Sequence, residues 1–541
     1  MRLRRLRSQG SESDPTSPAP ARTEHRFWRA LRRISGWLGA LLGGALIGAA
    51  IWIRTTFGLI TVDQMLANLS GGGEGVPEGY LSSFVWQVLV LPAVAILAAY
   101  AVARVMRWRV RRNARSRDLG PGMVRRGADA TSKWLPGLAA VSVLCAGAGL
   151  FAQTIDLAGY VRSLTTDFSL ADYYVVPTVA ENPDPKNLVV IYLESAENAF
   201  GDERYVEENA FAPLEGVTQG WQSIENLKQF DGGGWTMAGI VGTQCGVPLR
   251  GTQTAQAGRL DEIGAHSSEF MAGATCLGDV LRQAGYENVF LGGADASFAS
   301  KGNFLRTHGF DEVHDLEYWR EEGVAEESEW GASDRSLMEQ AKDEIDRLHE
   351  TGRPFNLTML TLDSHEPVYL FDYCDADTEI ALTSALRCSM EQVAGFVEHI
   401  EEQGYLDDTV VVLMGDHEKF VVAQSEYRDF ATIENRTIFN RIWAPDGAEI
   451  ARDDVDQLSM YATMLDLLGF DVADHRAGVG VSATVPASAK TGMLALRPAY
   501  YREAVESRSG DLYAKLWGLP DGQTVDADYF DPNNPDRASE E

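Results

Sequence analysis

Basic residues are scarce for a chain of this length, and their scarcity limits the partners that the chain can bind. Of its 541 residues, 47 are Lys or Arg and 78 are Asp or Glu, which gives a formal net charge of −31 at pH 7. A protein that binds the phosphate backbone of nucleic acid needs the opposite balance, because that contact depends on Lys and Arg. The composition therefore argues against nucleic acid as a partner.

Cysteine is also rare, with five residues and no CxxC pattern of the kind that holds a structural metal. Cys145 lies in an apolar run, whereas the other four cysteines form two pairs that are close in sequence. If the domain that carries those four lies outside the cytoplasm, the simplest disulfides join Cys245 to Cys276 and Cys374 to Cys388.

Charge is missing altogether from three long stretches, which are Ser35–Ile53, Ser83–Ala103 and Trp134–Ala152. Each stretch is about as long as a helix needs to be to cross a bilayer. The first lies too far from the start of the chain for a signal peptide, and no small-residue cleavage site follows it. The pattern predicts three transmembrane helices.

The distribution of arginine predicts how these helices are oriented. Residues 1–33 contain nine Arg and three acidic residues, and residues 104–133 contain ten Arg or Lys and two acidic residues. The glycine-rich loop between the first two apolar stretches has almost no basic residues. Because loops rich in Lys and Arg stay in the cytoplasm, the N-terminus and loop 104–133 are expected there, and everything beyond residue 153 outside.

These features divide the chain into five parts. We predict a basic cytoplasmic arm, a membrane domain, a connector, an α/β domain and an acidic C-terminal extension, over residues 1–34, 35–153, 154–186, 187–490 and 491–541. Within the connector, Asp156–Tyr174 has helical spacing of apolar residues that suits a helix against the membrane surface. The extension suggests no role.

From Asn187 onward, short apolar runs alternate with amphipathic segments. The runs predicted as strands are Asn187–Leu193, Asn288–Leu291, Phe355–Leu362, Thr409–Met414 and Arg436–Trp443, and the predicted helices are Thr275–Ala284, Leu337–His349, Cys388–Gln403 and Gln457–Leu468. This alternation predicts a mostly parallel sheet with helices on both faces. In such sheets, ligands bind beyond the carboxyl ends of the strands.

Polar residues stand at just those positions. Glu194, His365 and the pair Asp416 and His417 follow three of the predicted strands, so they are expected at one edge of the sheet. A glycine-rich stretch, Asp231–Pro248, adds the hydroxyl of Thr236 at the head of a predicted helix, where a phosphate is favoured.

If these groups converge, they form a site for a hard divalent cation. The carboxylates of Glu194 and Asp416, the imidazole of His417 and the hydroxyl of Thr236 suit manganese or magnesium better than structural zinc. A cation on the Thr236 oxygen makes it a nucleophile at neutral pH, and His365 is placed to protonate a leaving alcohol or to hold a phosphate oxygen.

The motifs that carry these residues resemble the sulfatase-like branch of the alkaline phosphatase superfamily, and more closely its membrane-anchored phosphoglycerol transferases, which include lipoteichoic acid synthases. The matching motifs are Ile191–Ser195, Gly234–Leu249 and Met414–His417. The second is similar to that of the phosphoglycerol transferases that modify periplasmic glucans of Gram-negative bacteria. The likeness covers roughly residues 186–485.

The resemblance implies a role for each residue of the predicted site. It makes Glu194, Thr236, Asp416 and His417 the metal ligands, Thr236 the nucleophile, and His365 a contact for the phosphoglycerol. Lys301 falls in the substrate-binding stretch, where Ala299-Ser-Lys301 replaces the Trp-Asn-Arg of lipoteichoic acid synthases, and Trp235 is a further candidate for substrate contact. The missing Trp argues against lipoteichoic acid synthesis, and Thr236 cannot mature to the formylglycine of a sulfatase.

The resemblance therefore implies an enzyme of the bacterial inner membrane whose catalytic domain faces the periplasm. Such an enzyme transfers phosphoglycerol from phosphatidylglycerol to a glucan hydroxyl through a covalent Thr236 intermediate, with Mn²⁺ as the most suitable metal and Mg²⁺ as the other choice. A phosphoethanolamine transferase or a phosphodiesterase would share the same metal and nucleophile. A membrane-tethered binding module without catalysis is the remaining alternative.

Overall fold

The computed structural model describes residues 21–56, 60–62, 65, 78–116, 135–166, 168–178, 184–250, 269–324, 326–421 and 425–518. The chain separates into two compact units. One comprises Met1–Trp52 and Ser83–Phe151, and the other comprises Ile53–Ser82 and Ala152–Glu541.

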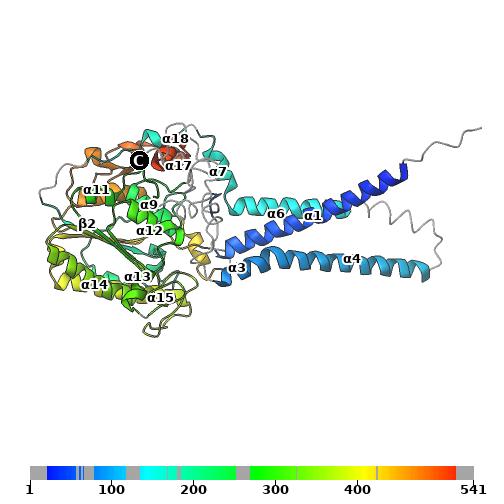
Figure 1. Ribbon diagram of the computed structural model, residues 1–541, viewed down its shortest axis with the longest axis horizontal. Helices are drawn as coiled ribbons and strands as arrows, with labels where there is room; N and C mark the ends of the chain where they lie inside the picture. Colours follow the sequence, from blue (N-terminus) through cyan, green and yellow to red (C-terminus); the bar gives the residue numbers. More distant parts are fainter. Residues whose placement is uncertain are drawn as a thin grey trace, which may run out of the picture. The chain divides into compact units, whose positions relative to one another are not determined.

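The first unit is built from long apolar helices, coloured blue to cyan in Figure 1. They are α1 (Ala21–Thr56), α3 (Glu78–Val85), the π-helical turn η1 (Trp86–Val90), α4 (Leu91–Ser116) and α6 (Leu135–Thr154). Three segments are long and apolar enough to cross a membrane, namely Ile34–Thr56, Ser82–Met106 and Gly137–Thr154. They overlap the three predicted spans, of which only Trp134 lies outside the described residues.

Glycines allow the helices of this unit to pack closely. A Cβ added to Gly43 would meet the backbone of Leu144 at 2.7 Å, and one added to Gly147 would meet the Gly43 carbonyl at 2.3 Å. Gly48 approaches the Gln87 carbonyl in the same way, at 2.3 Å. Close backbone approach at small residues is typical of helices that associate in a bilayer, where no hydrophobic effect drives them together. The stretch 104–133, expected to be a loop, begins as helix, because α4 continues to Ser116.

The second unit contains a six-stranded sheet whose order is β3-β2-β4-β1-β5-β6. The strands are β1 (Asn187–Leu193), β2 (Glu287–Gly292), β3 (Glu312–His314), β4 (Phe355–Leu360), β5 (Thr409–Gly415) and β6 (Asn440–Trp443), and a small hairpin pairs β7 (Arg476–Ala477) with β8 (Gly480–Val481). Neighbours from β3 through β5 are parallel, and β6 is antiparallel to β5. The expected mostly parallel sheet is therefore confirmed.

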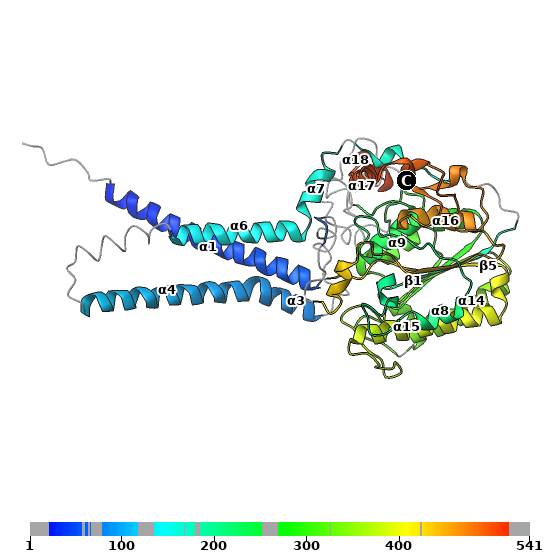
Figure 2. The same cartoon turned by 180° about the vertical axis from the view of Figure 1, so that it is seen from behind.

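Helices cover both faces of this sheet (Figures 1 and 2). One face packs under α9 (Thr236–Cys245), α11 (Leu277–Gln283), α12 (Lys301–Thr307), α16 (Met460–Leu467), α17 (Pro498–Glu506) and α18 (Gly510–Leu516). The other packs under α8 (Ala212–Val217), α13 (Leu316–Glu322), α14 (Asp334–Thr351) and α15 (Ala381–Glu402). Every residue of β1 and β5 is buried, which explains their unbroken apolar sequences.

Side chains along β1 alternate between the two cores. Leu188, Val190 and Tyr192 belong to the core beneath α9 and α16, whereas Val189 and Ile191 belong to the core beneath α14 and α15. This period of two is what a strand between two helical layers requires. Strand β6 alternates between buried and half-buried residues instead; β5 pairs with one of its edges, and an isolated bridge joins Ile442 to Gln222 at the other.

Two predicted elements differ in the structure. The predicted strand Arg436–Trp443 is limited to Asn440–Trp443, because the backbone before Asn440 bonds elsewhere: the Asn198 amide donates to the Thr437 carbonyl, and the Ile438 amide donates to the Leu227 carbonyl. The continuous helix expected over Asp156–Tyr174 is also wrong. The structure has only α7 (Leu157–Ser163) and the short 3₁₀ turn η2 (Leu170–Asp172) there. The Leu170 amide donates hydrogen bonds to the hydroxyls of Ser507 and Ser509, and the residue before it has an extended backbone, which interrupts the helix.

Candidate active site

Two neighbouring strands deliver three potential metal ligands to one point. Glu194 follows β1 and Asp416 follows β5, and the register pairs Leu193 with Gly415, so the two carboxylates emerge side by side. His417 comes next in the chain. One ligand atom from each of Glu194, Asp416 and His417 lies within 4.8 Å of the others, and all three residues are buried.

The two carboxylate oxygens of Asp416 have different surroundings. Oδ1 accepts hydrogen bonds from the backbone amides of Ser195 and His417, each at 2.8 Å. Oδ2 is buried and has no hydrogen-bond partner among the described residues. Because a buried charged oxygen without a partner is costly, this atom needs a proton or a cation beside it.

His417 presents its lone pair to the same point. Its Nδ1–H donates to the Glu418 carbonyl at 2.9 Å, so Nε2 is left as the acceptor nitrogen. Nε2 faces Asp416 Oδ2 at 3.5 Å and Glu194 Oε1 at 3.7 Å. A histidine that donates one nitrogen to a carbonyl and turns the other toward carboxylates has the orientation of a metal ligand.

Glu194 is held by hydrogen bonds on both its side chain and its backbone. Oε1 accepts from the Ser195 hydroxyl at 2.7 Å, and Oε2 accepts from the Thr236 hydroxyl at 3.4 Å. The Glu194 amide donates to Thr361 Oγ1 at 2.9 Å, and its carbonyl accepts from Ser364 Oγ at 2.9 Å. Ser195 adopts a left-handed φ of 55°, which turns its amide toward Asp416 and is a local strain of the kind found at functional sites.

The electrostatics of the cluster reflect its crowding. Burial raises the pKa of Asp416 to about 7, and the neighbouring charge of Glu194 adds to this effect. Burial opposes ionisation of Glu194 as well, but the interactions of its carboxylate with His365 and His417, with the Ser195 hydroxyl and with Lys419 together outweigh burial and lower the pKa of that carboxyl. Burial also works against the charged form of His417, yet Asp416 and Glu194 raise its pKa overall. The raised pKa values of Asp416 and His417 mean that this crowded site holds either a proton or a cation beside Asp416 Oδ2.

Thr236 stands at the start of α9, with Trp235 as the extended N-cap residue. The first amides of a helix lack partners within the helix, so they and the helix dipole favour an anion at this end. The chain reaches this position through a turn at Gly232, whose φ of 101° suits glycine. Gly239 lets α9 pack directly on the end of β5, because a Cβ there would meet the Asp416 carbonyl at 2.0 Å.

His365 lies beside this cluster on the segment after β4. Its Nδ1–H donates to the Glu366 carbonyl at 2.9 Å, which leaves Nε2 free to accept a proton. The indole of Trp330 packs on the imidazole with ring centres 4.0 Å apart. Burial lowers the pKa of His365 despite the opposing charge of Glu194, so the neutral form is favoured.

Two buried lysines flank the carboxylates. Lys301 opens α12 after two residues with left-handed φ angles, Ala299 and Ser300, and burial lowers the pKa of its ammonium. Lys419 is equally buried, and its Nζ pairs with the exposed carboxylate of Glu366. The charges of both reach the site, since Glu194 influences the pKa of Lys301 and Lys419 helps to lower that of Glu194.

Sequence motifs had not singled out Lys419, or Ser195 as a ligand-orienting residue. Ser195 is part of the quoted strand-end motif and was detectable there. Lys419 was not, because its partner Glu366 lies on a different segment of the chain. Trp235, proposed from sequence as a substrate contact, is half-buried beside Thr236 and packs against the core beneath α9.

The four paired cysteines form the two disulfides Cys245–Cys276 and Cys374–Cys388. The first joins the last residue of α9 to the residue before α11. Cys276, Asp279 and His308 also gather closely enough to resemble a metal site. That grouping is structural, since the Cys276 sulfur is in the disulfide and both His308 nitrogens are hydrogen-bonded, to Asp279 and to the Phe270 carbonyl.

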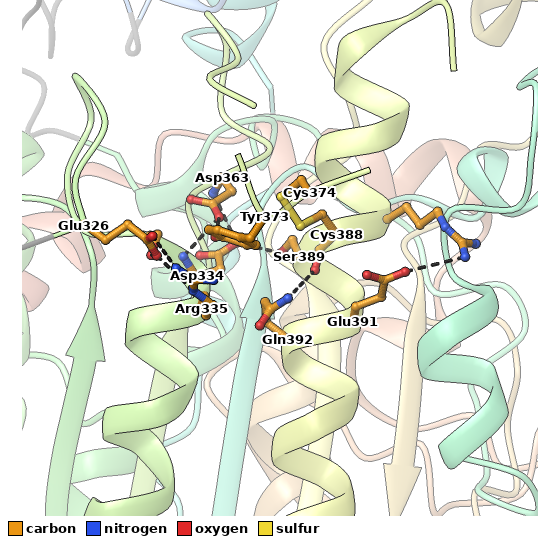
Figure 3. The surroundings of a disulfide bond; sticks show 12 residues. Glu326, Asp334, Arg335, Asp363, Tyr373, Cys374, Cys388, Ser389, Glu391 and Gln392 are labelled. Carbon is orange, nitrogen blue, oxygen red and sulfur yellow. Dashed lines mark hydrogen bonds and ion pairs between the residues drawn. A yellow bond between two sulfur atoms is a disulfide. The ribbon is translucent and has the colours of Figure 1, made fainter. Parts of the chain in front are cut away.

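The second disulfide lies beside a buried pair of carboxyl groups (Figure 3). Asp334 accepts from the amides of Leu362 and Asp363 and from the Ser389 hydroxyl, and Asp363 accepts from the Asp334 amide and the Tyr373 hydroxyl. These bonds fasten the start of α14 to the segment that leads from β4 to His365. The pair therefore supports the position of His365.

The residues present fit a divalent metal ion. The unpartnered Asp416 Oδ2, the inward lone pair of His417 and the mixed oxygen and nitrogen donors match the ligand set of a hard cation. Thr236 Oγ1 and the Glu194 carboxylate complete a set of four residues around one point.

The sheet and its strand-end site define the class of the protein. The family model described as Sulfatase matches residues 186–470, which is more than half of the chain. The chain therefore belongs to the Sulfatase family.

Two curated proteins and one solved structure show in more detail what the chain is similar to. Phosphoglycerol transferase I of Xanthomonas axonopodis pv. citri (strain 306) is 34% identical over 368 residues, covering 66% of this chain and 48% of that protein. Phosphoglycerol transferase I of Escherichia coli O139:H28 (strain E24377A / ETEC) is 32% identical over 339 residues, covering 60% and 42%. The chain thus spans about half the length of the curated relatives it matches. Among solved structures, the lipoteichoic acid synthase LtaP from Listeria monocytogenes has a TM-score of 0.49 and 17% identity, covering 65% of this chain and 98% of LtaP.

Proposed function

We propose that this protein is a membrane-anchored phosphoglycerol transferase that uses Thr236 as its nucleophile. The observation that carries the proposal is the placement of the Thr236 hydroxyl at the N-terminus of α9, 3.4 Å from Glu194 in a buried cluster with Asp416 and His417. The names of the two curated relatives support the transferred group. Phosphatidylglycerol is the proposed donor, and a periplasmic glucan hydroxyl is the proposed acceptor.

The reaction we propose has two steps. In the first, the Thr236 oxygen forms a bond to the donor phosphorus while the bond from phosphorus to the diacylglycerol oxygen breaks. In the second, the acceptor hydroxyl forms a bond to the same phosphorus, and the Thr236 oxygen leaves and regains a proton. A covalent intermediate of this kind divides one difficult transfer into two easier ones.

The chain's own groups can carry the protons and charges. Glu194 Oε2 accepts the hydrogen bond of the Thr236 hydroxyl, takes this proton when the Thr236 oxygen bonds to phosphorus, and returns it when that oxygen leaves in the second step. The Nε2 atom of His365, free because Nδ1 is occupied, protonates the leaving alcohol after it has accepted a proton, and it removes one from the acceptor hydroxyl. Lys301 and Lys419 place positive charge near the phosphate.

The metal proposed for Glu194, Thr236, Asp416 and His417 is Mn²⁺, with Mg²⁺ as the other choice. A divalent cation held there lowers the pKa of a coordinated hydroxyl and offsets the negative charge of the phosphate. The location we propose is the bacterial inner membrane. In this arrangement the basic N-terminal arm is cytoplasmic and the domain that follows the connector is periplasmic, so the donor lies within reach of the site and the acceptor is on the same side.

A transfer assay with the full chain tests this function. The wild-type protein and Thr236→Ala are reconstituted in vesicles with radiolabelled phosphatidylglycerol, with and without glucan. The proposal expects label in the glucan for the wild type and a loss of at least about a hundredfold for Thr236→Ala, because one nucleophile is removed. The neighbouring Thr243, which bonds the Gly239 carbonyl within α9, supplies the control variant Thr243→Ser. Label released to water at the same rate with or without glucan would identify a phosphodiesterase instead.

A further inference from the structure

Helix α7 exposes its apolar face and buries its polar face, which is the opposite of what a surface helix in water does. Leu157, Val161 and Leu164 are spaced four and three residues apart, so they share one face, and their exposed fractions are 41%, 52% and 51%. A surface helix of a water-soluble domain turns such a stripe toward its core. Here the stripe points away from the domain.

The polar side of α7 packs inward. Gly159 and Ser163 are buried, and the guanidinium of Arg508 lies over the Tyr160 ring at 4.1 Å and bonds the Ser163 hydroxyl at 3.3 Å. On the same side, Arg162 and Glu506 approach each other at 3.8 Å. The C-terminal helices α17 and α18 thereby fix the orientation of α7. The outward apolar face is held in place and does not result from a loose segment.

Chain connectivity indicates what covers this face. The third apolar segment, Gly137–Thr154, ends three residues before Leu157. Three residues of extended chain span at most about 11 Å. If that segment crosses the membrane, Leu157 cannot lie far from the bilayer surface. Interfacial helices bury their apolar side by roughly 5–10 Å at the boundary of head groups and acyl chains.

We propose that α7 is an interfacial helix whose face of Leu157, Val161 and Leu164 is seated in the lipid surface. The occupant of the face is the bilayer that carries the chain, in preference to a second protein, because the apolar span ends next to it.

The inner side of α7 links the lipid surface to the nucleophile. Behind the helix lies a cavity of about 160 Å³, lined by Asp156 and Tyr160 on one side and by Asp231 and Trp235 on the other. Trp235 directly precedes Thr236. Because α7 and this loop form walls of one cavity, seating α7 in lipid holds the Thr236 loop near the head-group layer. This consequence rests on the proposed function.

Depth measurements on the full chain test the seating. A fluorophore is attached to Val161→Cys, in a protein that also carries Cys145→Ala, and the protein is reconstituted in vesicles of phosphatidylcholine and phosphatidylglycerol. A probe at Glu350→Cys, on an exposed residue in the last turn of α14, is the matched control. We expect spin-labelled lipid to quench the probe at 161 and aqueous iodide to quench the probe at 350. Equal iodide quenching at both positions, with no lipid quenching at 161, would overturn the proposal.

A kinetic arm separates this inference from the proposed function. Val161→Ser loses about 1 kcal/mol of burial in lipid, so its apparent KM for phosphatidylglycerol in vesicles should rise about fivefold. The activity of Val161→Ser on water-soluble short-chain phosphatidylglycerol should match that of the wild type. The control variant Glu350→Ser should match the wild type with both donors. Equal losses on both donors would contradict interfacial seating. Absence of transfer by the wild type would contradict the proposed function, while the quenching result would still decide the position of α7.

Discussion

The pairing of Lys419 with Glu366 joins a buried cation to an exposed carboxylate beside His365. The Lys419 side chain is 5% accessible and that of Glu366 is 56% accessible. Such an arrangement suits an anion site, because a phosphate can replace the exposed carboxylate as the partner of the ammonium.

Opposite effects on substrate affinity are therefore expected from the two halves of this pair. Lys419→Met removes positive charge near the phosphate and should raise the KM for the donor by about tenfold, as expected for the loss of one charge-assisted hydrogen bond. Glu366→Gln frees the ammonium and should lower that KM. The control is Glu215→Gln on α8, which breaks the ion pair of Glu215 with Arg441 of β6. A rise in KM in both variants would show that the pair only stabilises the fold.

Asp363 makes stability depend on pH in a defined direction. Burial raises its pKa to about 9, and the charge of Asp334 adds to this shift. An unfolded Asp ionises near pH 3.9, so between roughly pH 4 and pH 9 the folded state binds the proton more tightly. Stability from this group is therefore greatest at the acidic end of that window and falls as pH rises, by up to about 1.4 kcal/mol per pH unit.

Asp363→Asn replaces the protonated carboxyl by a neutral amide and should flatten this dependence. Thermal unfolding of the full chain from about pH 5 to about pH 9 should show a smaller fall in Tm for the variant than for the wild type. The exposed Asp377→Asn should behave as the wild type. An identical slope in Asp363→Asn and the wild type would mean that Asp363 is ionised in the folded protein.

The convergence of the candidate ligands was predictable from the sequence because a parallel sheet collects its strand ends. Glu194 and Asp416 each follow an unbroken apolar run, and the structure brings them together with His417. The sequence predicted that Thr236 and Glu194 lie close together, but it did not predict the hydrogen bond from the Thr236 hydroxyl to Glu194. The distances that decide chemistry, such as the unpartnered Asp416 Oδ2, depend on side-chain packing, which no sequence pattern fixes.

At the scale of secondary-structure elements, we expect the two disulfides to contribute unequally to activity. Cys245–Cys276 closes a separation of 31 residues and fixes the end of α9, the helix that begins with Thr236. Cys374–Cys388 closes a separation of 14 residues and joins Cys388 of α15 to the segment before that helix. Loop closure predicts stabilisation of roughly 4 kcal/mol and roughly 3 kcal/mol respectively.

Paired alanine variants test this difference. Cys245→Ala with Cys276→Ala should lose clearly more kcat than Cys374→Ala with Cys388→Ala, when each is assayed at the same number of degrees below its own Tm. The physical reason is that only the first pair fixes the helix whose N-terminus carries Thr236, the proposed nucleophile. Equal kcat in the two double variants would remove any special role for the α9 disulfide.

Sequence periodicity predicted most of the strands and helices of the α/β unit, because their apolar runs are long and fully buried. It failed for the connector and for the C-terminal extension. Helix α7 is short and its apolar face points outward, so its spacing suggested a longer helix than the one that forms. Residues 498–516 form α17 and α18, and the contacts of α17 with α7 and of α18 with η2 arise from tertiary packing alone.

At the scale of the whole molecule, the arginine distribution implies a definite orientation in the membrane. In intact cells, a membrane-impermeant maleimide should label Glu350→Cys in the proposed periplasmic domain. It should label Ser116→Cys, at the end of the basic helix α4, only after the membrane is permeabilised. Both variants carry Cys145→Ala. Labelling of Ser116→Cys in intact cells would reverse the proposed topology.

The central claim is that Thr236 carries the phosphoglycerol between donor and acceptor. The most direct test is mass spectrometry of the peptide that contains Thr236, after the full chain has been incubated with phosphatidylglycerol and quenched without an acceptor. The account predicts a phosphoglycerol adduct on Thr236 that disappears when glucan is added. An adduct on another residue, or no adduct while transfer to glucan proceeds, would contradict it.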